Sequence, residues 1–169
     1  MKIIVFSDTH GYTEYARNVL KRIGEYADMV FHLGDYDADA RELADLFPML
    51  AFHWVKGNND YGGDTPSERM VSAEGVRFLL THGHRQGVHN GVLNLAYRAQ
   101  EMDADVVLYG HTHRAVSVHR GALMMVNPGS ISAPRDSTVP TFAILAVENG
   151  YVECAIMEYH REDMFLRRR

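Results

Sequence analysis

The stretch KIIVFSDTH, residues 2–10, decides the fold, because a short apolar run leads directly into polar side chains. Lys2–Phe6 contains two isoleucines and a valine, residue types that favour a buried β-strand. Apolar residues then recur at helical spacing from Tyr12 to Ile23, and Gly24 ends the pattern. A strand followed by a polar loop and a helix is the first part of a βαβ unit, so we expect a parallel sheet.

The same order repeats up to residue 55. Met29–Leu33 and Met49–Val55 are apolar runs of strand length. A helical stripe from Ala40 to Phe47 separates them and ends before Pro48. This βαβαβ order predicts parallel strands in one sheet with helices on its face.

The second half of the chain favours antiparallel pairing. Three glycine-containing turns, Glu74-Gly75, Arg120-Gly121 and Asn149-Gly150, each separate two apolar runs, and Asn-Gly is a strong hairpin signal. We predict an α/β fold in which two mixed β-sheets pack face to face as a sandwich flanked by helices, in a single domain of residues 1–169. The remaining predicted elements are the strands Glu68–Ala73, Val76–Leu80, Val106–Tyr109, Ala115–His119, Ala122–Val126, Thr141–Val147 and Tyr151–Met157, and the helix Val92–Met102.

Composition narrows the function classes. The 169 residues are 46% hydrophobic, enough for a sizeable core, and no apolar run is long enough to span a membrane. The net charge of −5 argues against a general grip on nucleic acid, and the basic end Arg167-Arg168-Arg169 is expected to be solvated. The first strand reaches Ser7 too soon for a secretory signal, and the single cysteine, Cys154, is expected to pack in a strand. We therefore expect a cytoplasmic protein.

Side chains that bind metal ions follow five of the predicted strands. In open α/β sheets, ligands bind outside the carboxyl ends of the strands, so these loops are expected to meet at one edge. Carboxylate oxygen and imidazole nitrogen suit Mn, Fe, Ni, Co or Zn, and the absence of cysteine from these motifs excludes a structural zinc site of the thiolate type. The residues are Asp8, His10, Asp35, Asn58, His82, His111 and His113, with glycines beside them at positions 34, 57, 83 and 110.

The ordered set of motifs resembles the calcineurin-like metallophosphoesterases. It comprises D-x-H at residues 8–10, G-D at 34–35, G-N-x-D at 57–60, H-G-H at 82–84 and G-H-T-H at 110–113. The short chain, with Asn127-Pro128-Gly129-Ser130 followed by Pro134-Arg135, is similar to the small prokaryotic branch of YfcE-type phosphodiesterases. Each motif is weak alone, but the ordered set is highly specific.

The resemblance implies a site for two divalent metal ions, with Mn favoured and Ni, Fe, Co or Zn as alternatives. Asp35 would bridge the ions, and a hydroxide between them would attack phosphorus in line with the leaving oxygen. Asn58 would help to hold the phosphoryl oxygens. One ion would be bound by Asp8, His10, Asp35 and His113, and the other by Asp35, Asn58, His82 and His111.

One position departs from many relatives, which have histidine directly after the motif asparagine. Here the residue is Asn59, whose amide can donate a hydrogen bond to substrate but cannot act as a general acid at neutral pH. The departure favours phosphodiesters over phosphomonoesters. His84 is close in sequence and is our hypothesis for the proton donor to the leaving group. Arg135 is a candidate for binding the substrate phosphate, with a surface salt bridge as the alternative.

Several of these residues allow a second interpretation. Asp8 and Asp35 could each cap a helix. His32 could support the site or be a core histidine, and Asp60 is expected to orient a ligand or hold its loop. Trp54 and Tyr61 could stack on a nucleobase or aryl group, with core packing or a subunit contact favoured instead.

The leading hypothesis is a two-metal phosphodiesterase of small or nucleotide-like substrates, with a homo-oligomer possible. The alternative is a protein-interaction scaffold of the same fold, as in a eukaryotic retromer subunit that this branch resembles. A complete set of metal ligands favours the phosphodiesterase over the scaffold.

Overall fold

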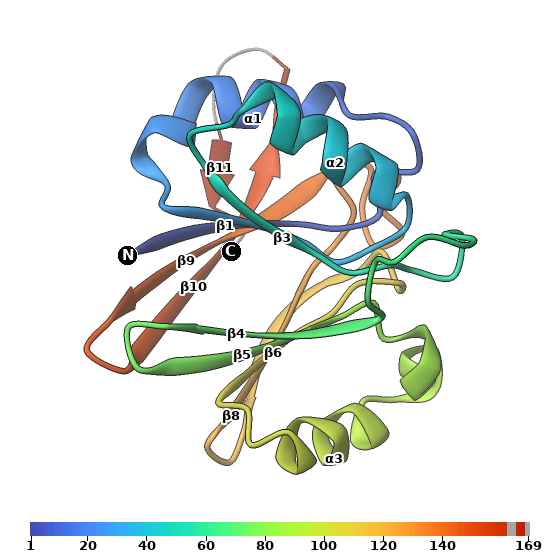
Figure 1. The fold of residues 1–169 in the computed structure, drawn as a ribbon, viewed down its shortest axis with the longest axis vertical. Coiled ribbons are helices and arrows are strands. Elements are labelled where there is room, and N and C mark those ends of the chain that lie inside the picture. Colours follow the sequence, from blue (N-terminus) through green and yellow to red (C-terminus); the bar gives the residue numbers. More distant parts are fainter. Residues whose placement is uncertain (162–164, 168–169) are drawn as a thin grey trace.

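The computed structural model describes residues 1–161 and 165–167, and it contains two mixed β-sheets stacked face to face (Figure 1). In the first sheet the strand order is β11-β10-β9-β1-β2-β3. Strands β1, β2 and β3 run parallel, and β9, β10 and β11 join antiparallel on the other side of β1. The bounds are β1 Lys2–Phe6, β2 Met29–His32, β3 Ala51–Trp54, β9 Thr141–Glu148, β10 Tyr151–Tyr159 and β11 Phe165–Arg167.

The second sheet has the order β4-β5-β6-β8-β7. Its inner strands β5, β6 and β8 are parallel, and each edge strand pairs antiparallel with its neighbour. The predicted pair of mixed sheets is confirmed. The bounds are β4 Glu68–Ala73, β5 Val76–Thr81, β6 Val106–Leu108, β7 Ala115–Arg120 and β8 Leu123–Pro128.

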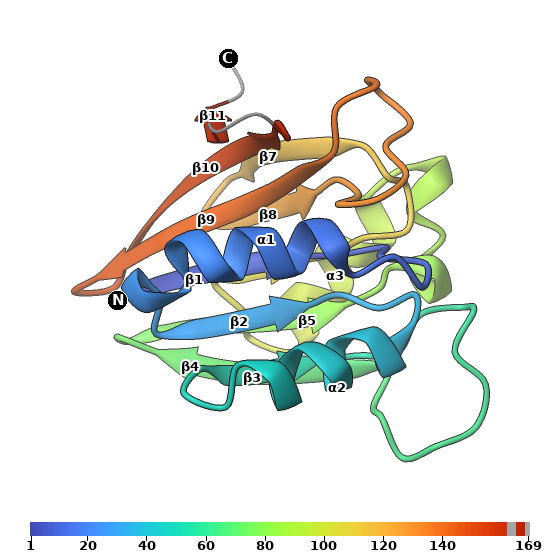
Figure 2. The same cartoon turned by 90° about the horizontal axis from the view of Figure 1, so that it is seen from above.

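Helices cover both outer faces of the sandwich. Helices α1 (Glu14–Ile23) and α2 (Asp37–Leu46) lie side by side over the first sheet, and α3 (Leu93–Glu101) lies on the second (Figures 1 and 2). Two short 3₁₀ turns, His84–Gln86 and Val88–Asn90, precede α3, and a third, Gly24–Tyr26, follows α1. None of the helices in the described part of the chain is long and apolar enough to cross a bilayer.

The alternation of side chains along β1 explains the layers. Ile3 and Val5 are fully buried in the core between the sheets, where they join residues of the second sheet such as Phe78. Ile4 and Phe6 point the other way and pack under α1 with residues such as Val19. Because successive side chains of a strand point to opposite faces, one apolar strand serves two cores.

Most differences from the sequence prediction lie at element ends. Strand β3 begins only at Ala51, because Met49 is 94% exposed and outside the pairing. Helix α2 begins at Asp37, earlier than its apolar stripe, because Asp60 accepts the backbone N–H groups of Tyr36 and Asp37. Strand β11 has no counterpart in the prediction, and the last two residues of the basic end, 168 and 169, lie outside the described residues.

Two predicted hairpin turns are confirmed with their backbone conformation. Glu74 and Gly75 have φ of 50° and 80°, and Asn149 and Gly150 have φ of 50° and 83°. Positive φ at both central residues is the turn that matches the twist of the strands it connects. Cys154 lies in β10 and packs against the core between the sheets, as predicted.

Candidate metal centre

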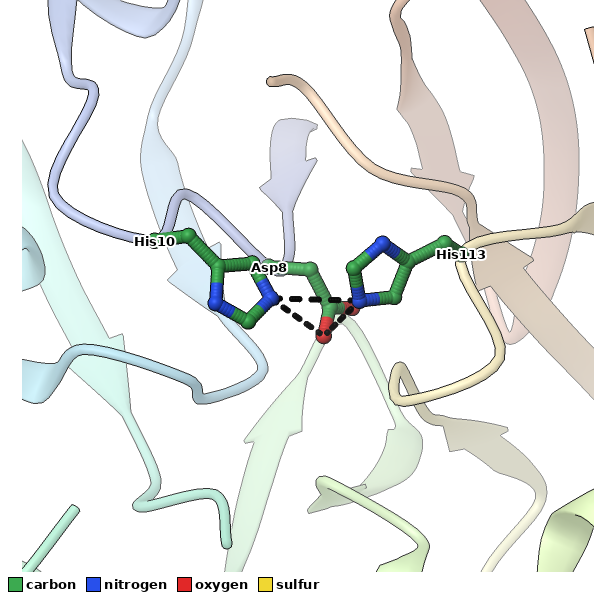
Figure 3. Close-up of side chains that lie close together, drawn as sticks. All are labelled: Asp8, His10 and His113. Carbon is green, nitrogen blue, oxygen red and sulfur yellow. Dashed lines mark hydrogen bonds and ion pairs between the residues drawn. The ribbon is translucent and has the colours of Figure 1, made fainter. Parts of the chain in front are cut away.

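Carboxylates and imidazoles from loops far apart in sequence meet at one edge of the sandwich. Asp8 follows β1, Asp35 follows β2 and His82 follows β5. His113, from the loop after β6, brings its Nε2 atom to 3.2 Å from Asp8 Oδ1 and 3.1 Å from His10 Nε2 (Figure 3). The carboxyl ends of the parallel strands therefore form the site, as the placement of these residues predicts.

Asp8 is the buried centre of this cluster, and its two oxygens have different surroundings. Oδ2 accepts hydrogen bonds from Ser7 Oγ at 2.6 Å and from the His111 backbone N–H at 3.1 Å. Oδ1 is buried and has no hydrogen-bond partner. It faces His113 Nε2 at 3.2 Å and His82 Nε2 at 3.8 Å. A buried carboxylate oxygen with no donor is costly unless another group satisfies it, and a cation is such a group.

Asp35 presents one oxygen to each side of the cluster. Oδ1 lies 3.3 Å from His82 Nε2, and Oδ2 lies 3.6 Å from His10 Nε2. Asn59 donates its backbone N–H to Oδ1 at 3.0 Å and its side-chain amide to Oδ2 at 2.7 Å. Each oxygen thus has one protein donor and still has a lone pair for a further partner.

Two imidazoles are oriented by backbone carbonyl groups. His82 Nδ1 lies 2.8 Å from the Leu33 oxygen, and His113 Nδ1 lies 2.6 Å from the Ala133 oxygen. A carbonyl can only accept, so in each ring Nδ1 carries the proton and donates it. Nε2 is left with a lone pair that is available to a metal ion, an arrangement common in metal sites.

The charges of the cluster shift its pKa values. Burial alone would raise the pKa of Asp8, but the nearby imidazoles of His113 and His82, together with the Ser7 hydroxyl, outweigh burial and lower it. Asp35 behaves in the same way, with His82 and Asn59 lowering its pKa. Burial would lower the pKa of His82 and of His113, but Asp35 and Asp8 raise them. The carboxylates therefore stay ionised more readily, and they favour protonation of the imidazoles beside them in the absence of metal.

The donor set fits divalent cations. Among the described residues, two groups could each hold a metal ion, because the ligand atoms within each group lie within 4.8 Å of one another. The groups are Asp8, His10 and His113, and Asp8, Asp35 and His82. The groups share Asp8, whereas the family resemblance implies a shared Asp35. Because Asp8 Oδ2 already accepts two hydrogen bonds, Asp8 has one oxygen to offer, while Asp35 has one on each side.

Strained backbone holds these ligands in place. Left-handed φ is uncommon outside glycine, and here it occurs at five of the predicted metal ligands. Two glycines let the loops approach closely: a Cβ on Gly57 would collide with Asp35 Oδ1, and one on Gly110 with Ser7 Oγ. The five ligands are Asp8 (φ 56°), His10 (49°), Asp35 (54°), His111 (68°) and His113 (57°).

The other predicted ligands lie against His82. Asn58 is exposed, and its Oδ1 lies 3.2 Å from His82 Nε2. The ring centroid of His111 is 5.1 Å from that of His82. Burial, followed by the charges of His82 and His89, lowers the pKa of His111 to about 4, which keeps it neutral as a metal ligand must be.

The predicted catalytic and substrate residues lie at the rim. His84 is half-buried with its ring centroid 5.3 Å from that of His82, and its Nδ1 is buried without a hydrogen-bond partner. The side-chain amide of Asn59 donates a hydrogen bond to Asp35. The exposed Arg135 follows the loop that holds His113, and its backbone N–H donates to the His113 oxygen at 3.0 Å.

Two supporting residues have clear structural partners. Asp60 accepts backbone N–H groups of Tyr36, Asp37 and Gly57, so it holds the loop, as predicted. His32 is fully buried. Its Nε2 atom lies 3.1 Å from Thr9 Oγ1, and its Nδ1 atom accepts a hydrogen bond from the Gly34 backbone N–H. Burial lowers the pKa of His32 to about 4.

Sequence reasoning missed two aromatic residues at the site. His89 lies with its ring centroid 4.4 Å from that of His111, although no motif includes it. Tyr36 lies edge-on to His10 at 5.6 Å between centroids. Tyr36 directly follows the predicted ligand Asp35, and this position is the feature of the sequence that could have identified it. Of the aromatics considered for stacking, Tyr61 is 91% exposed, so core packing is wrong for it, and Trp54 is half-buried in β3.

Comparison with known proteins identifies the family and agrees with the fold. The family model of the calcineurin-like phosphoesterase superfamily domain matches residues 1–150. The chain is 41% identical to the probable metallophosphoesterase YsnB of Bacillus subtilis, over 88% of this chain and 86% of that protein. It is 29% identical to a phosphodiesterase of Methanocaldococcus jannaschii, over 94% of this chain and 100% of that protein.

A solved structure extends the likeness to three dimensions. The crystal structure of a predicted phosphoesterase from Streptococcus pneumoniae TIGR4 matches with a TM-score of 0.80 and 29% identity, over 99% of this chain and 97% of that one. The fold and the buried carboxylate–imidazole site thus define a metallophosphoesterase. The chain belongs to the calcineurin-like phosphoesterase superfamily.

Proposed function

We propose that this protein is a phosphodiesterase that uses two divalent metal ions to hydrolyse small or nucleotide-like phosphodiesters. The observation that carries the proposal is the buried Asp8 Oδ1, which lacks a donor and faces imidazole nitrogens of His113 and His82. A buried carboxylate aimed at metal-binding nitrogens is an arrangement for cations rather than for packing.

Asp35 is proposed as the residue shared by the two ions, with Asp8, His10 and His113 on one side and Asn58, His82 and His111 on the other. Its two oxygens face opposite imidazoles, His82 and His10, and each keeps a free lone pair. Bound there, the cations would supply positive charge for the phosphoryl oxygens and lower the pKa of a water nucleophile. Mn is the proposed metal, with Ni, Fe, Co and Zn as alternatives that suit the same donors.

Other residues at the rim are proposed to handle the substrate. The exposed Asn58 amide is placed to hold a phosphoryl oxygen, and Arg135 offers a guanidinium to the phosphate. His84 is the candidate donor to the leaving group, since its ring lies beside the cluster and its buried Nδ1 has no partner in the protein. Asn59 is an amide and cannot supply a proton there.

The preference for diesters is also supported by a relative, since the Methanocaldococcus jannaschii protein carries the name phosphodiesterase. The competing hypothesis is a protein-interaction scaffold of the same fold. The oriented Nε2 atoms of His82 and His113 favour metal chemistry, because a scaffold has no need for them.

Hydrolysis of bis(p-nitrophenyl) phosphate and of p-nitrophenyl phosphate with added Mn tests the proposal. We expect metal-dependent release of p-nitrophenolate from both, with the diester preferred in kcat/KM. Asp8→Asn is the matched variant, and it should lose the activity while remaining folded. If folded protein with bound metal turns over neither ester, the enzyme proposal fails.

A further inference from the structure

Tyr36 is a bulky residue in a backbone conformation that favours glycine. It has φ 79° and ψ 79°, directly after Asp35. Asp60 Oδ1 holds it there by accepting the backbone N–H of Tyr36 at 3.0 Å and that of Asp37 at 2.8 Å. A non-glycine residue in this region carries strain, and such strain concentrates at ligand-binding sites. The strained conformation is therefore consistent with a functional role for the side chain.

The ring of Tyr36 borders the carboxylate–imidazole cluster. Its centroid lies 5.6 Å from that of His10, with the planes at 61°. A Cβ built on Gly11 would lie 3.9 Å from Tyr36 Cε1, so the ring extends over the backbone of this glycine. Tyr36 is 41% exposed, whereas the adjacent Asp35 is 2% exposed. An aromatic surface thus lies open to solvent beside the site.

Two rim residues on a neighbouring loop are polar and offer no aromatic surface. Asn58 and Asn59 are exposed amides on the loop after β3. A phosphate ester presents a charged group and an organic group, and the two need different surroundings. The cluster suits the first, and the partly exposed aromatic side chain of Tyr36 suits the second.

We propose that a planar aromatic group of the substrate, a nucleobase or an aryl ring, stacks on Tyr36 while the phosphate lies at the cluster. Tyr36 is then a residue that determines substrate specificity. The inference rests on the proposed function for the position of the phosphate and adds the chemical class of the organic group. It differs from a purely structural role, in which the ring only supports His10.

The affinities of two ligands that differ in the presence of a base test the proposal. The probes are adenosine 5′-monophosphate and ribose 5-phosphate, titrated calorimetrically into Mn-loaded protein at one salt concentration. We expect the nucleotide to bind about tenfold more tightly to the natural protein, as base–aromatic stacking supplies. Tyr36→Phe should keep this ratio, and Tyr36→Leu, which keeps an apolar side chain without the aromatic ring, should reduce it to about twofold or less.

Each other outcome counts against the inference. A ratio near one in the natural protein, or an unchanged ratio in Tyr36→Leu, overturns it. Equal weakening of both ligands together with weaker Mn binding shows that Tyr36 only supports His10, and this also overturns it. Failure of the proposed function would give a different result. The natural protein would still prefer the nucleotide and Tyr36→Leu would lose that preference, but no phosphodiester would be hydrolysed.

Discussion

Asn59 donates to both oxygens of Asp35, through its backbone N–H at 3.0 Å and its side-chain amide at 2.7 Å. Asn59, directly after the motif asparagine, therefore orients one of the two carboxylates of the site. Hydrogen bonds to the charged form of a carboxylate lower its pKa, and Asn59 contributes in this way to the lowered pKa of Asp35. Its interaction with substrate remains a prediction.

Asn59→Ala is expected to weaken Mn binding by about tenfold, because loss of a partner that orients a ligand typically costs that much or more. Titration of metal-free protein with Mn measures the effect. Asn90→Ala, at an exposed position outside the ligand set, is the matched control and should bind Mn normally. Equal affinity in the two variants would show that the Asn59 amide does not support Asp35.

Asp35→Asn is expected to reduce bound Mn from two ions per chain to fewer than one, and Asp8→Asn is expected to leave one. The difference follows from geometry, since Asp35 faces His82 with one oxygen and His10 with the other. Activity of Asp35→Asn should fall by about 10³-fold, equivalent to roughly 4 kcal/mol in the barrier. Metal analysis after gel filtration measures the stoichiometry, and loss of a single ion in Asp35→Asn would contradict the bridge.

The sequence predicts the layers of the fold and the convergence of the ligand loops, because both depend on periodicity and on strand order. The alternation in β1 and the two positive-φ hairpin turns are local properties that one stretch of sequence determines. The placement of Asp8 and Asp35 after neighbouring parallel strands then brings them together.

Side-chain orientation within the site could not be predicted. The free Nε2 of His82 depends on the Leu33 oxygen, which belongs to a distant segment. The contact of His89 with His111 depends on the path of the loop through the left-handed Gly87. Such contacts arise from tertiary packing, and no spacing rule encodes them.

The thermal stability of the metal-free protein is expected to be greatest near pH 6.5. Burial lowers the folded-state pKa of His32 and of His111 to about 4, below the ordinary value of 6.5, so stability rises with pH between 4 and 6.5. The folded-state pKa values of His82 and His113 are raised above 6.5 by Asp35 and Asp8. The stability that His82 and His113 contribute is fully present below pH 6.5 and is lost as the pH rises through their folded-state pKa values.

Calorimetric Tm values, measured in chelator between pH 4 and pH values above 6.5, test this pH dependence. A change of 1 kcal/mol in the free energy of unfolding shifts Tm by roughly 2–4 °C. Mn should raise Tm more at high pH than at low pH, because the metal must displace protons from the imidazoles. A metal-free Tm that keeps rising above pH 6.5 would contradict the raised pKa values.

His84→Ala is expected to slow hydrolysis of a diester with an unactivated alkoxide leaving group by about 10²-fold. A p-nitrophenyl diester should be affected far less, because p-nitrophenolate leaves without a proton. Burial, followed by the charge of His82, lowers the pKa of His84, so the rate with the unactivated diester should rise as the pH falls toward that pKa. His119→Ala in the exposed part of β7 is the control. An unchanged rate and pH profile in His84→Ala would exclude this role.

Gly57→Ala is expected to destabilise the fold by about 1–3 kcal/mol and to impair Mn binding, because the added methyl group would collide with Asp35. The nearest atoms are Asp35 Oδ1 and the Asp35 backbone nitrogen, and neither can move without displacing the carboxylate. Gly24→Ala is a matched control: Gly24 has φ −59°, and its added methyl group would meet Leu50 Cδ1 at 3.5 Å, an ordinary contact. Urea unfolding with and without Mn measures both effects. Equal stability and equal Mn affinity in the two variants would show that the close approach of the Gly57 loop to Asp35 is not required.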